Sequence, residues 1–306
     1  MKRILVTGSN GLLGQKLTEA ISFDPELELI ATGKGPDRFP QNGKYEYAVL
    51  DVTNSGQVDE VLSKYKPDTV IHTAAMTNVD QCENNKDECW AANVDSIKNL
   101  IAACDKLKIH LIHISTDFIF DGEEGPYTEE AEPHPLSYYG LTKLEGEKLI
   151  RSSGCSWAIL RTIIVYGVVN DMSRSNIVLW AKGELEKGLP INVVNDQWRM
   201  PTLAEDLADC CILAAKKNAH GVYNASGKDM MSILEIVEKV ADYWKLNKSL
   251  INPISSASLN QSAKRPKRTG FVLNKTIADL GYAPHSFEEG LSVVDKQLNA
   301  YSKASK

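Results

Sequence analysis

No apolar run in the 306-residue sequence reaches about 18 residues, the length that a membrane-spanning helix needs. The N-terminus also lacks the long apolar stretch of a signal peptide, because a short strand-like pattern already begins at Arg3. A membrane is therefore not an expected partner. The expected location is the cytoplasm.

Metal-binding and disulfide patterns are also missing. The cysteines include no C-x-x-C pair and the histidines no H-E-x-x-H arrangement, so we predict no metal site and reduced, mostly structural thiols. The net charge of −6, with a pI near 5.6, argues against nucleic acid as a main partner. A homodimer is compatible with the sequence but is not required by it.

The remaining composition is that of a globular protein, with 43% hydrophobic and 24% charged residues. Strand-like and helical segments alternate in the first half, which predicts a parallel sheet with right-handed crossovers. The expected strands are 3–7, 27–32, 46–50, 69–73, 109–115, 156–162 and a returning strand at 221–225. The expected helices include 54–64, 86–106, 174–187, 203–217, 232–245 and 286–300.

The length exceeds that of one compact core. We therefore expect an α/β fold of the Rossmann type: a doubly wound parallel sheet with a smaller, discontinuous C-terminal α/β substrate lobe. Residues 1–165 are assigned to the dinucleotide-binding domain, with the returning strand near 221–225. Residues 166–306 mainly form the substrate lobe.

A glycine turn follows the first expected strand and precedes an amphipathic helix. Its spacing is G-x-x-G-x-x-G, and its position favours a dinucleotide pyrophosphate over a purely structural turn. The expected cofactor contacts from this segment are Gly8, Asn10, Gly11, Leu12, Leu13 and Gly14.

Tyr139 and Lys143 are four residues apart, so on a helix they share one face. A nearby ammonium can lower the pKa of a phenol into the range useful for proton transfer. Thr116 can add a hydroxyl to the same substrate oxygen. These three residues are the predicted catalytic set, although any amphipathic helix can carry such a pair by chance.

The glycine turn, the 115–117 strand end and the Tyr139/Lys143 pair resemble the extended short-chain dehydrogenase/reductase superfamily. Within it, residues 115–122, 138–147 and 195–197 resemble dTDP-4-dehydrorhamnose reductases, which reduce a 4-keto deoxysugar nucleotide. The related regulatory β subunit of methionine adenosyltransferase shares these segments, and 197–202 looks slightly more like it. The resemblance thus implies an NAD(P)-dependent sugar-nucleotide reductase of carbohydrate biosynthesis. A regulatory subunit and an epimerase or dehydratase are the alternatives.

The end of the second strand bears on cofactor choice. Gly33 stands where many of these reductases carry an acidic residue, and Lys34, with Arg38, can face a ribose 2′-phosphate or simply be solvated. NADP(H) is therefore the preferred cofactor, with NAD(H) as the alternative. The resemblance adds cofactor contacts at Asp51, Val52, Thr73, Ala74, Ala75, Tyr139 and Lys143.

A nucleotide-sugar substrate is the expected small-molecule partner. Asp117 either contacts sugar hydroxyls or caps the following turn, while Thr116 orients the carbonyl oxygen. Gln197, Arg199 and Arg265 are candidates for the nucleotide and diphosphate, because arginine presents a fork of donors, but the basic segment 264–268 can also be a solvated loop. Ile164 replaces a tryptophan of the rhamnose reductases, so the sugar pocket must differ in shape.

Overall fold

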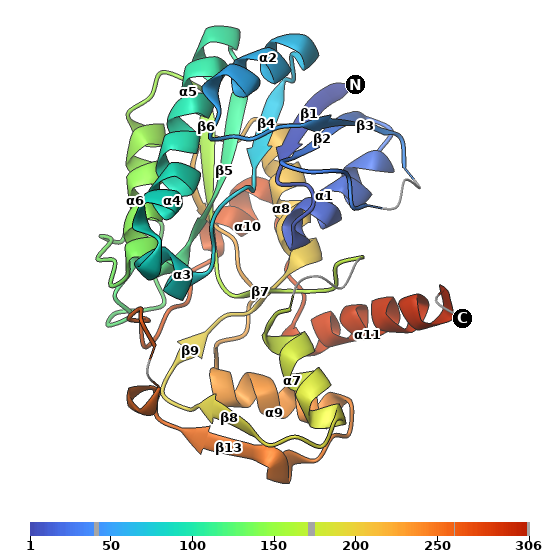
Figure 1. Ribbon diagram of the computed structural model, residues 1–306, viewed down its shortest axis with the longest axis vertical. Helices are drawn as coiled ribbons and strands as arrows, with labels where there is room; N and C mark the ends of the chain where they lie inside the picture. The colour runs from blue at the N-terminus through green and yellow to red at the C-terminus, as the bar shows by residue number, and fades with distance from the viewer. Residues whose placement is uncertain (40–42, 171–174, 260, 305–306) are drawn as a thin grey trace.

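The computed structural model describes residues 1–39, 43–170, 175–259 and 261–304. Its largest element is a seven-stranded sheet in the order β11-β6-β5-β4-β1-β2-β3, with every neighbouring pair parallel (Figure 1). The strands are β1 (Lys2–Thr7), β2 (Leu27–Gly33), β3 (Tyr45–Val49), β4 (Thr69–His72), β5 (His110–Thr116), β6 (Trp157–Thr162) and β11 (Gly221–Asn224). The predicted parallel α/β sheet is confirmed.

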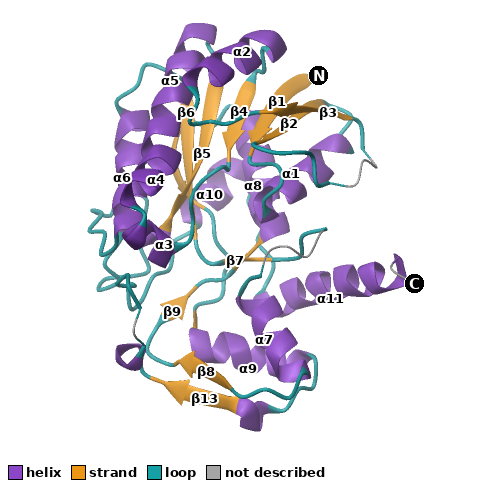
Figure 2. Cartoon of the chain, viewed as in Figure 1, coloured by secondary structure: helices purple, strands orange, loops and turns teal. Residues whose placement is uncertain are grey.

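The sheet is covered by helices on both faces (Figure 2). Successive side chains of a strand point to opposite faces, so Ile4 and Val6 join one buried cluster while Leu5 joins another. The first cluster contains residues of α1 (Leu12–Ser22) and α8 (Ala204–Lys217). The second contains residues of α2 (Ser55–Tyr65), α5 (Ser96–Leu107) and α6 (Tyr138–Arg151). Near-continuous apolar strands are what a sheet buried on both faces requires.

The strand order reverses direction at β1, which lies between β2 and β4. Connections from strands on either side of this point run to opposite faces of the sheet. A crevice forms there at the carboxyl ends of the strands, the usual ligand position in such folds.

The helices predicted from periodicity are found within about four residues of their expected ends. The helix predicted over 86–106 is α4 (Lys86–Trp90), a π-helical turn η1 (Ala91–Asp95) and α5. The helix predicted over 174–187 is α7 (Ile177–Glu186), and residue 174 lies outside the described residues. The remaining helical segments are α3 (Val79–Asn84), η2 (Asp117–Ile119), α9 (Ile233–Tyr243), η3 (Lys248–Leu250), η4 (Ser256–Ser258), α10 (Asn274–Leu280) and α11 (Phe287–Ala304).

The described part of the second half adds three two-stranded sheets and a buried cluster of its own. Apolar residues of α7, α9 and α11 form this cluster together with β8 (lower part of Figure 1). The sheets pair β8 (Ile191–Val194) with β13 (Ile251–Ile254), β9 (Trp198–Arg199) with β12 (Met231–Ser232), and β7 (Val165–Tyr166) with β10 (Thr202–Leu203). The domain boundary at 165 stays a prediction.

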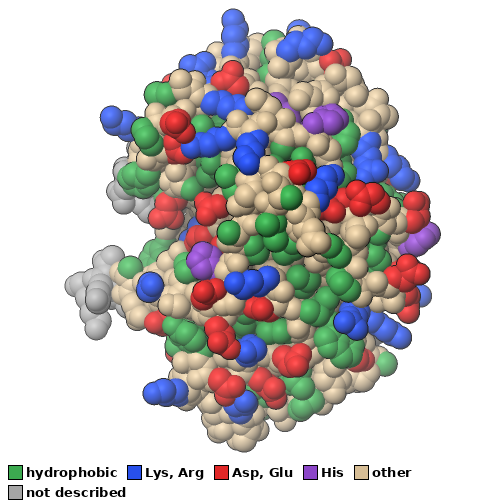
Figure 3. Space-filling model, turned by 180° about the vertical axis from the view of Figure 1, so that it is seen from behind, with side chains coloured by type: hydrophobic (Ala, Val, Ile, Leu, Met, Phe, Trp, Pro, Cys, Tyr) green, Lys and Arg blue, Asp and Glu red, His purple; other side chains and the backbone are tan. Residues whose placement is uncertain are grey.

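On the face turned away in Figure 1, acidic and basic side chains are interspersed, and neither sign dominates (Figure 3). Among the described residues, no helix combines the length and the apolar character needed to cross a bilayer.

Candidate active site

The glycine turn leaves the start of α1 free to receive an anion. Gly8 has a φ of 71°, in the left-handed region, and Gly11, the N-cap residue, supplies no side-chain cap. A Cβ on Gly14 would lie 2.2 Å from the Gly8 carbonyl oxygen, so only glycine allows this close contact between helix and turn. Uncapped N–H groups at a helix N-terminus bind phosphate. The turn therefore fits a dinucleotide pyrophosphate.

A cavity of about 1290 Å³ lies between the carboxyl ends of the sheet strands and the elements of the second half. It exceeds the roughly 300–1,000 Å³ of a pocket for one small ligand, which suits two ligands side by side. All site residues predicted from the sequence line it except Asp51: Gly8, Asn10, Gly11, Leu12, Leu13, Gly14, Lys34, Val52, Thr73, Ala74, Ala75, Thr116, Asp117, Tyr139, Lys143, Gln197, Arg199 and Arg265.

Asp51 instead pairs with Lys34 at the rim of this cavity. The Lys34 Nζ lies 3.2 Å from the Asp51 carboxylate, and Lys34 is 65% exposed. Leu50, Val52 and Thr53 line the cavity around it. Asp51, whose side chain is 34% exposed, therefore lies beside the cavity, where it holds Lys34.

Tyr139 reaches Thr116 because α6 approaches η2 closely. The helix begins after Ser137, whose hydroxyl accepts a hydrogen bond from the Gly140 N–H at 3.2 Å. A Cβ on Gly140 would lie 2.1 Å from the Phe118 carbonyl oxygen, so a side chain there would push the helix away. With glycine in place, the Tyr139 phenol lies close enough to the Thr116 side chain for Thr116 to influence its pKa.

The surroundings of Tyr139 differ from the prediction that the Lys143 ammonium lowers the pKa of the phenol. Burial raises the pKa of Tyr139, and the nearby Thr116 side chain opposes that shift, so the phenol holds its proton at neutral pH. Lys143 is not among the main influences on this pKa. Its Nζ donates to the Ile114 carbonyl at 2.7 Å and lies 3.1 Å from His113 Nε2. Burial lowers the pKa of Lys143 to about 8.

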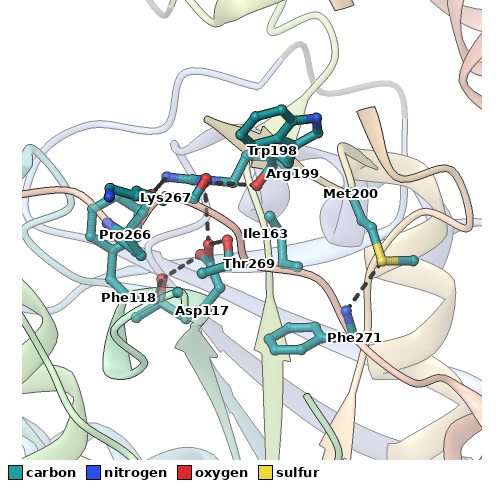
Figure 4. A network of polar contacts seen from close by, with 12 residues as sticks. Asp117, Phe118, Ile163, Trp198, Arg199, Met200, Pro266, Lys267, Thr269 and Phe271 are labelled. Atoms are coloured by element: carbon teal, nitrogen blue, oxygen red, sulfur yellow. Dashed lines mark hydrogen bonds and ion pairs between the residues drawn. The ribbon is translucent and has the colours of Figure 1, made fainter. Parts of the chain in front are cut away.

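Asp117 lies at the centre of a buried polar network (Figure 4). Its carboxylate accepts a short hydrogen bond from the Thr269 hydroxyl and one of 3.2 Å from Thr116, and Arg199 Nε lies 3.7 Å away. Burial raises the pKa of Asp117, while the charge of Arg199 opposes the shift. Thr116, rather than Asp117, caps the following turn by accepting from the Phe118 N–H.

The two predicted diphosphate arginines are both engaged within the protein. Arg199 donates to the carbonyl oxygens of Trp198, Lys267 and Pro266 at 2.7, 3.3 and 2.7 Å. Arg265 forms a two-pronged ion pair with Asp80, at 2.6 and 3.3 Å.

Arg199 is therefore the counter-ion of Asp117 and a clamp on the 266–267 loop, which leaves it little free for a diphosphate. Arg265 must break its ion pair with Asp80 before both of its terminal nitrogens can bind a diphosphate. Gln197, which is 7% exposed, makes no side-chain hydrogen bond with the described residues.

Sequence reasoning missed the partners of these residues. Thr269 and Asp80 hold Asp117 and Arg265 from 152 and 185 positions away, and no local pattern marks them. No motif in the sequence singled out His113, the neighbour of Lys143. His113 lies three residues before Thr116 on the same strand, and this spacing could have indicated that it lies near the site.

Comparison with known proteins identifies the family to which this chain belongs. Residues 1–299 match the family model described as "RmlD substrate binding domain". The chain is 30% identical over 315 residues to a dTDP-4-dehydrorhamnose reductase of Aggregatibacter actinomycetemcomitans, covering 99% of this chain and 100% of that protein. It is also 30% identical over 271 residues to methionine adenosyltransferase 2 subunit beta of Bos taurus, covering 87% and 79%.

A solved structure shows the same architecture. The dTDP-4-dehydrorhamnose reductase of Bacillus anthracis, in complex with NADP, superposes with a TM-score of 0.83 at 28% identity and covers 97% of this chain and 100% of its own. The family match spans both the glycine turn and the Tyr139 helix, so the likeness is not limited to the cofactor half. The chain belongs to the RmlD substrate binding domain family of extended short-chain dehydrogenase/reductases.

Proposed function

We propose that the protein uses NADPH to reduce the 4-keto group of a nucleotide-linked deoxysugar, as a dTDP-4-dehydrorhamnose reductase does. The observation that carries this proposal is the meeting of Thr116, Tyr139 and Lys143 with the glycine turn in one cavity. The hydroxyls of Thr116 and Tyr139, with the buried Lys143 ammonium in the same cavity as the glycine turn, are suited to protonating an alkoxide oxygen.

When bound, NADPH would supply the hydride for the carbonyl carbon. Tyr139 donates the proton to the carbonyl oxygen, and it is available for this because burial keeps the phenol protonated. Thr116 donates a second hydrogen bond to the same oxygen, for which its single hydroxyl proton must turn away from the Asp117 carboxylate. Lys143 would hold the nicotinamide ribose, for which its buried ammonium must turn one N–H toward the cavity.

For the substrate we assign Gln197 to the nucleotide and Arg265 to the diphosphate, after release from Asp80. Asp117, held by Thr269 and Arg199, orients Thr116 and lines the sugar end of the cavity. Ile164 also lines it, with a φ of 32° that is unusual for a β-branched residue. The pocket is therefore shaped differently from one that presents a tryptophan there.

The direct test is to mix purified protein with NADPH and dTDP-4-dehydro-L-rhamnose and to follow the absorbance of the reduced nicotinamide. We expect one NADPH to be oxidised for each sugar reduced. If a different 4-keto sugar nucleotide is the better substrate, the proposed reaction class stands and only the proposed sugar changes. Absence of oxidation with every keto sugar tried would refute a reductase.

Two other functions share these residues. The likeness to methionine adenosyltransferase 2 subunit beta favours a subunit that binds NADPH without consuming it and docks on another enzyme. A dehydratase of this superfamily needs an additional carboxylate beside the threonine, and Asp117 occupies that position. A dehydratase or an epimerase regenerates its cofactor at the end of each catalytic cycle. Net consumption of NADPH therefore separates the reductase from both.

We propose NADPH over NADH because of Lys34 at the cavity rim. Replacing it by alanine, K34A, is expected to weaken NADPH binding about three- to tenfold and to leave NADH binding unchanged, since a charge-assisted hydrogen bond to the 2′-phosphate is lost. Titration of both cofactors by fluorescence checks this. Lys44→Ala, an exposed lysine of the same region that does not line the cavity, is the control. Equal losses for both cofactors would contradict the assignment.

A further inference from the structure

A row of buried side chains crosses the main sheet and ends at Lys143. Thr7, His72 and His113 occupy paired positions on the neighbouring strands β1, β4 and β5. The Thr7 hydroxyl lies 2.8 Å from His72 Nδ1, and the His72 ring stacks on His113 with centroids 5.4 Å apart. His113 Nε2 then lies 3.1 Å from the Lys143 ammonium. The sheet register therefore places a histidine beside the lysine of the site.

The contact determines which nitrogen of His113 holds the proton. An ammonium has only donors, so Nε2 must accept and the proton must sit on Nδ1. Nδ1 has no hydrogen-bond partner among the described residues, although a buried N–H without a partner costs free energy. Burial, together with Lys143 and His72, lowers the pKa of His113 well below its usual value, so the ring stays neutral.

We infer that His113 is a positioning residue for Lys143. Its Nε2 and the Ile114 carbonyl take two of the three ammonium hydrogens, which leaves the third for the cavity. The row from Thr7 through His72 holds the His113 ring in place. The inference rests on the proposed function, in which Lys143 meets the cofactor.

The groups around Lys143 give the direction of the expected effect. Burial lowers the pKa of Lys143 to about 8, while Glu147 on the same helix and Cys89 on α4 raise it. His72 and His113 on the sheet are neutral acceptors or donors rather than charges. A neutral acceptor favours the ammonium over the amine, so removing it lowers the pKa of Lys143 further. NADPH binding that requires the charged form of Lys143 is then lost at a lower pH than in the wild type.

The test is the affinity for NADPH, measured by tryptophan fluorescence across a pH series centred on about 8. In the wild type the affinity should fall as pH rises through the pKa of Lys143. His113→Leu is expected to move this midpoint to lower pH by about one unit, and therefore to weaken binding by up to about tenfold at pH values above the wild-type midpoint. His113→Gln should restore both values, because its amide oxygen can accept the hydrogen bond.

Two further variants separate this role from a structural one. His113→Asn keeps a polar, smaller side chain too short to reach Nζ, so it should behave like His113→Leu even if the leucine variant folds poorly. His110→Leu removes another buried histidine of β5, one that bonds Ser156 at the opposite end of the strand, and should leave the midpoint unchanged.

The outcomes are distinct from those of the activity test. An unchanged midpoint in both the leucine and asparagine variants overturns the inference, as does wild-type binding that is independent of pH. A wild type that shows the midpoint and its shift but reduces no keto sugar refutes the proposed reaction and leaves the role of His113 standing. A wild type that binds neither NADPH nor NADH overturns both.

Discussion

Replacing Tyr139 by phenylalanine is expected to lower kcat for the keto sugar by on the order of 10²–10⁴-fold, the contribution of a positioned proton donor. The hydroxyl is the only group lost, and the ring keeps its buried place beside Phe118, with centroids 5.7 Å apart. NADPH affinity should change little, since the glycine turn and Lys143 remain. Steady-state oxidation of NADPH, with affinity measured separately, checks both expectations.

Tyr138 provides the matched control. It precedes Tyr139 on α6, is half-buried and lies against Lys86 rather than in the cavity. Tyr138→Phe should therefore retain wild-type kcat. If both variants kept full activity, Tyr139 could not be the acid; if both lost it equally, the loss would report disturbance of the helix.

The largest expected change in stability comes from Arg161→Met. Arg161 on β6 and Glu147 on α6 are each 1% exposed and form a two-pronged pair at 3.0 and 2.7 Å. Removing the arginine leaves a carboxylate buried without its partner, which costs about 3–5 kcal/mol of unfolding free energy. Urea denaturation, with midpoint and slope compared, measures the loss.

Two comparisons test the cause. In the double variant Arg161→Met/Glu147→Leu no charge is left unpaired, so it should lose less stability than Arg161→Met alone. Lys148→Met breaks the exposed pair with Glu145 on the same helix and should cost at most about 1 kcal/mol. A double variant as unstable as the single one would mean that lost side-chain contacts, such as that of Arg161 with the Phe120 ring, dominate.

Local patterns predicted much of this molecule. Strand β1 and the helices α2 and α8 were expected within one residue of their ends, because apolar periodicity depends on neighbours in sequence. The π-helical turn η1 was not expected, since it interrupts a run whose periodicity is helical throughout. The cavity-lining positions of the glycine turn and of Tyr139 likewise followed from short motifs.

The electrostatics of the site could not be predicted in the same way. We expected Lys143 to act on Tyr139 because four residues separate them on a helix. The structure directs its ammonium to Ile114 and His113 on β5, so burial rather than the lysine dominates the pKa of the phenol. Helical spacing places two side chains on one face, but the neighbouring strand determines which acceptor each one meets.

The sequence by itself determined the parallel α/β architecture and the place of the glycine turn, because these follow from local spacing and from the order of elements. Many of the other predicted site residues came from the family resemblance. The tertiary structure alone decided the partners of the charged residues: Asp80 for Arg265, Asp117 for Arg199 and His113 for Lys143. The physical reason is that each contact depends on strand register and on loops far apart in the chain, where burial makes an unpaired charge costly and so selects its partner.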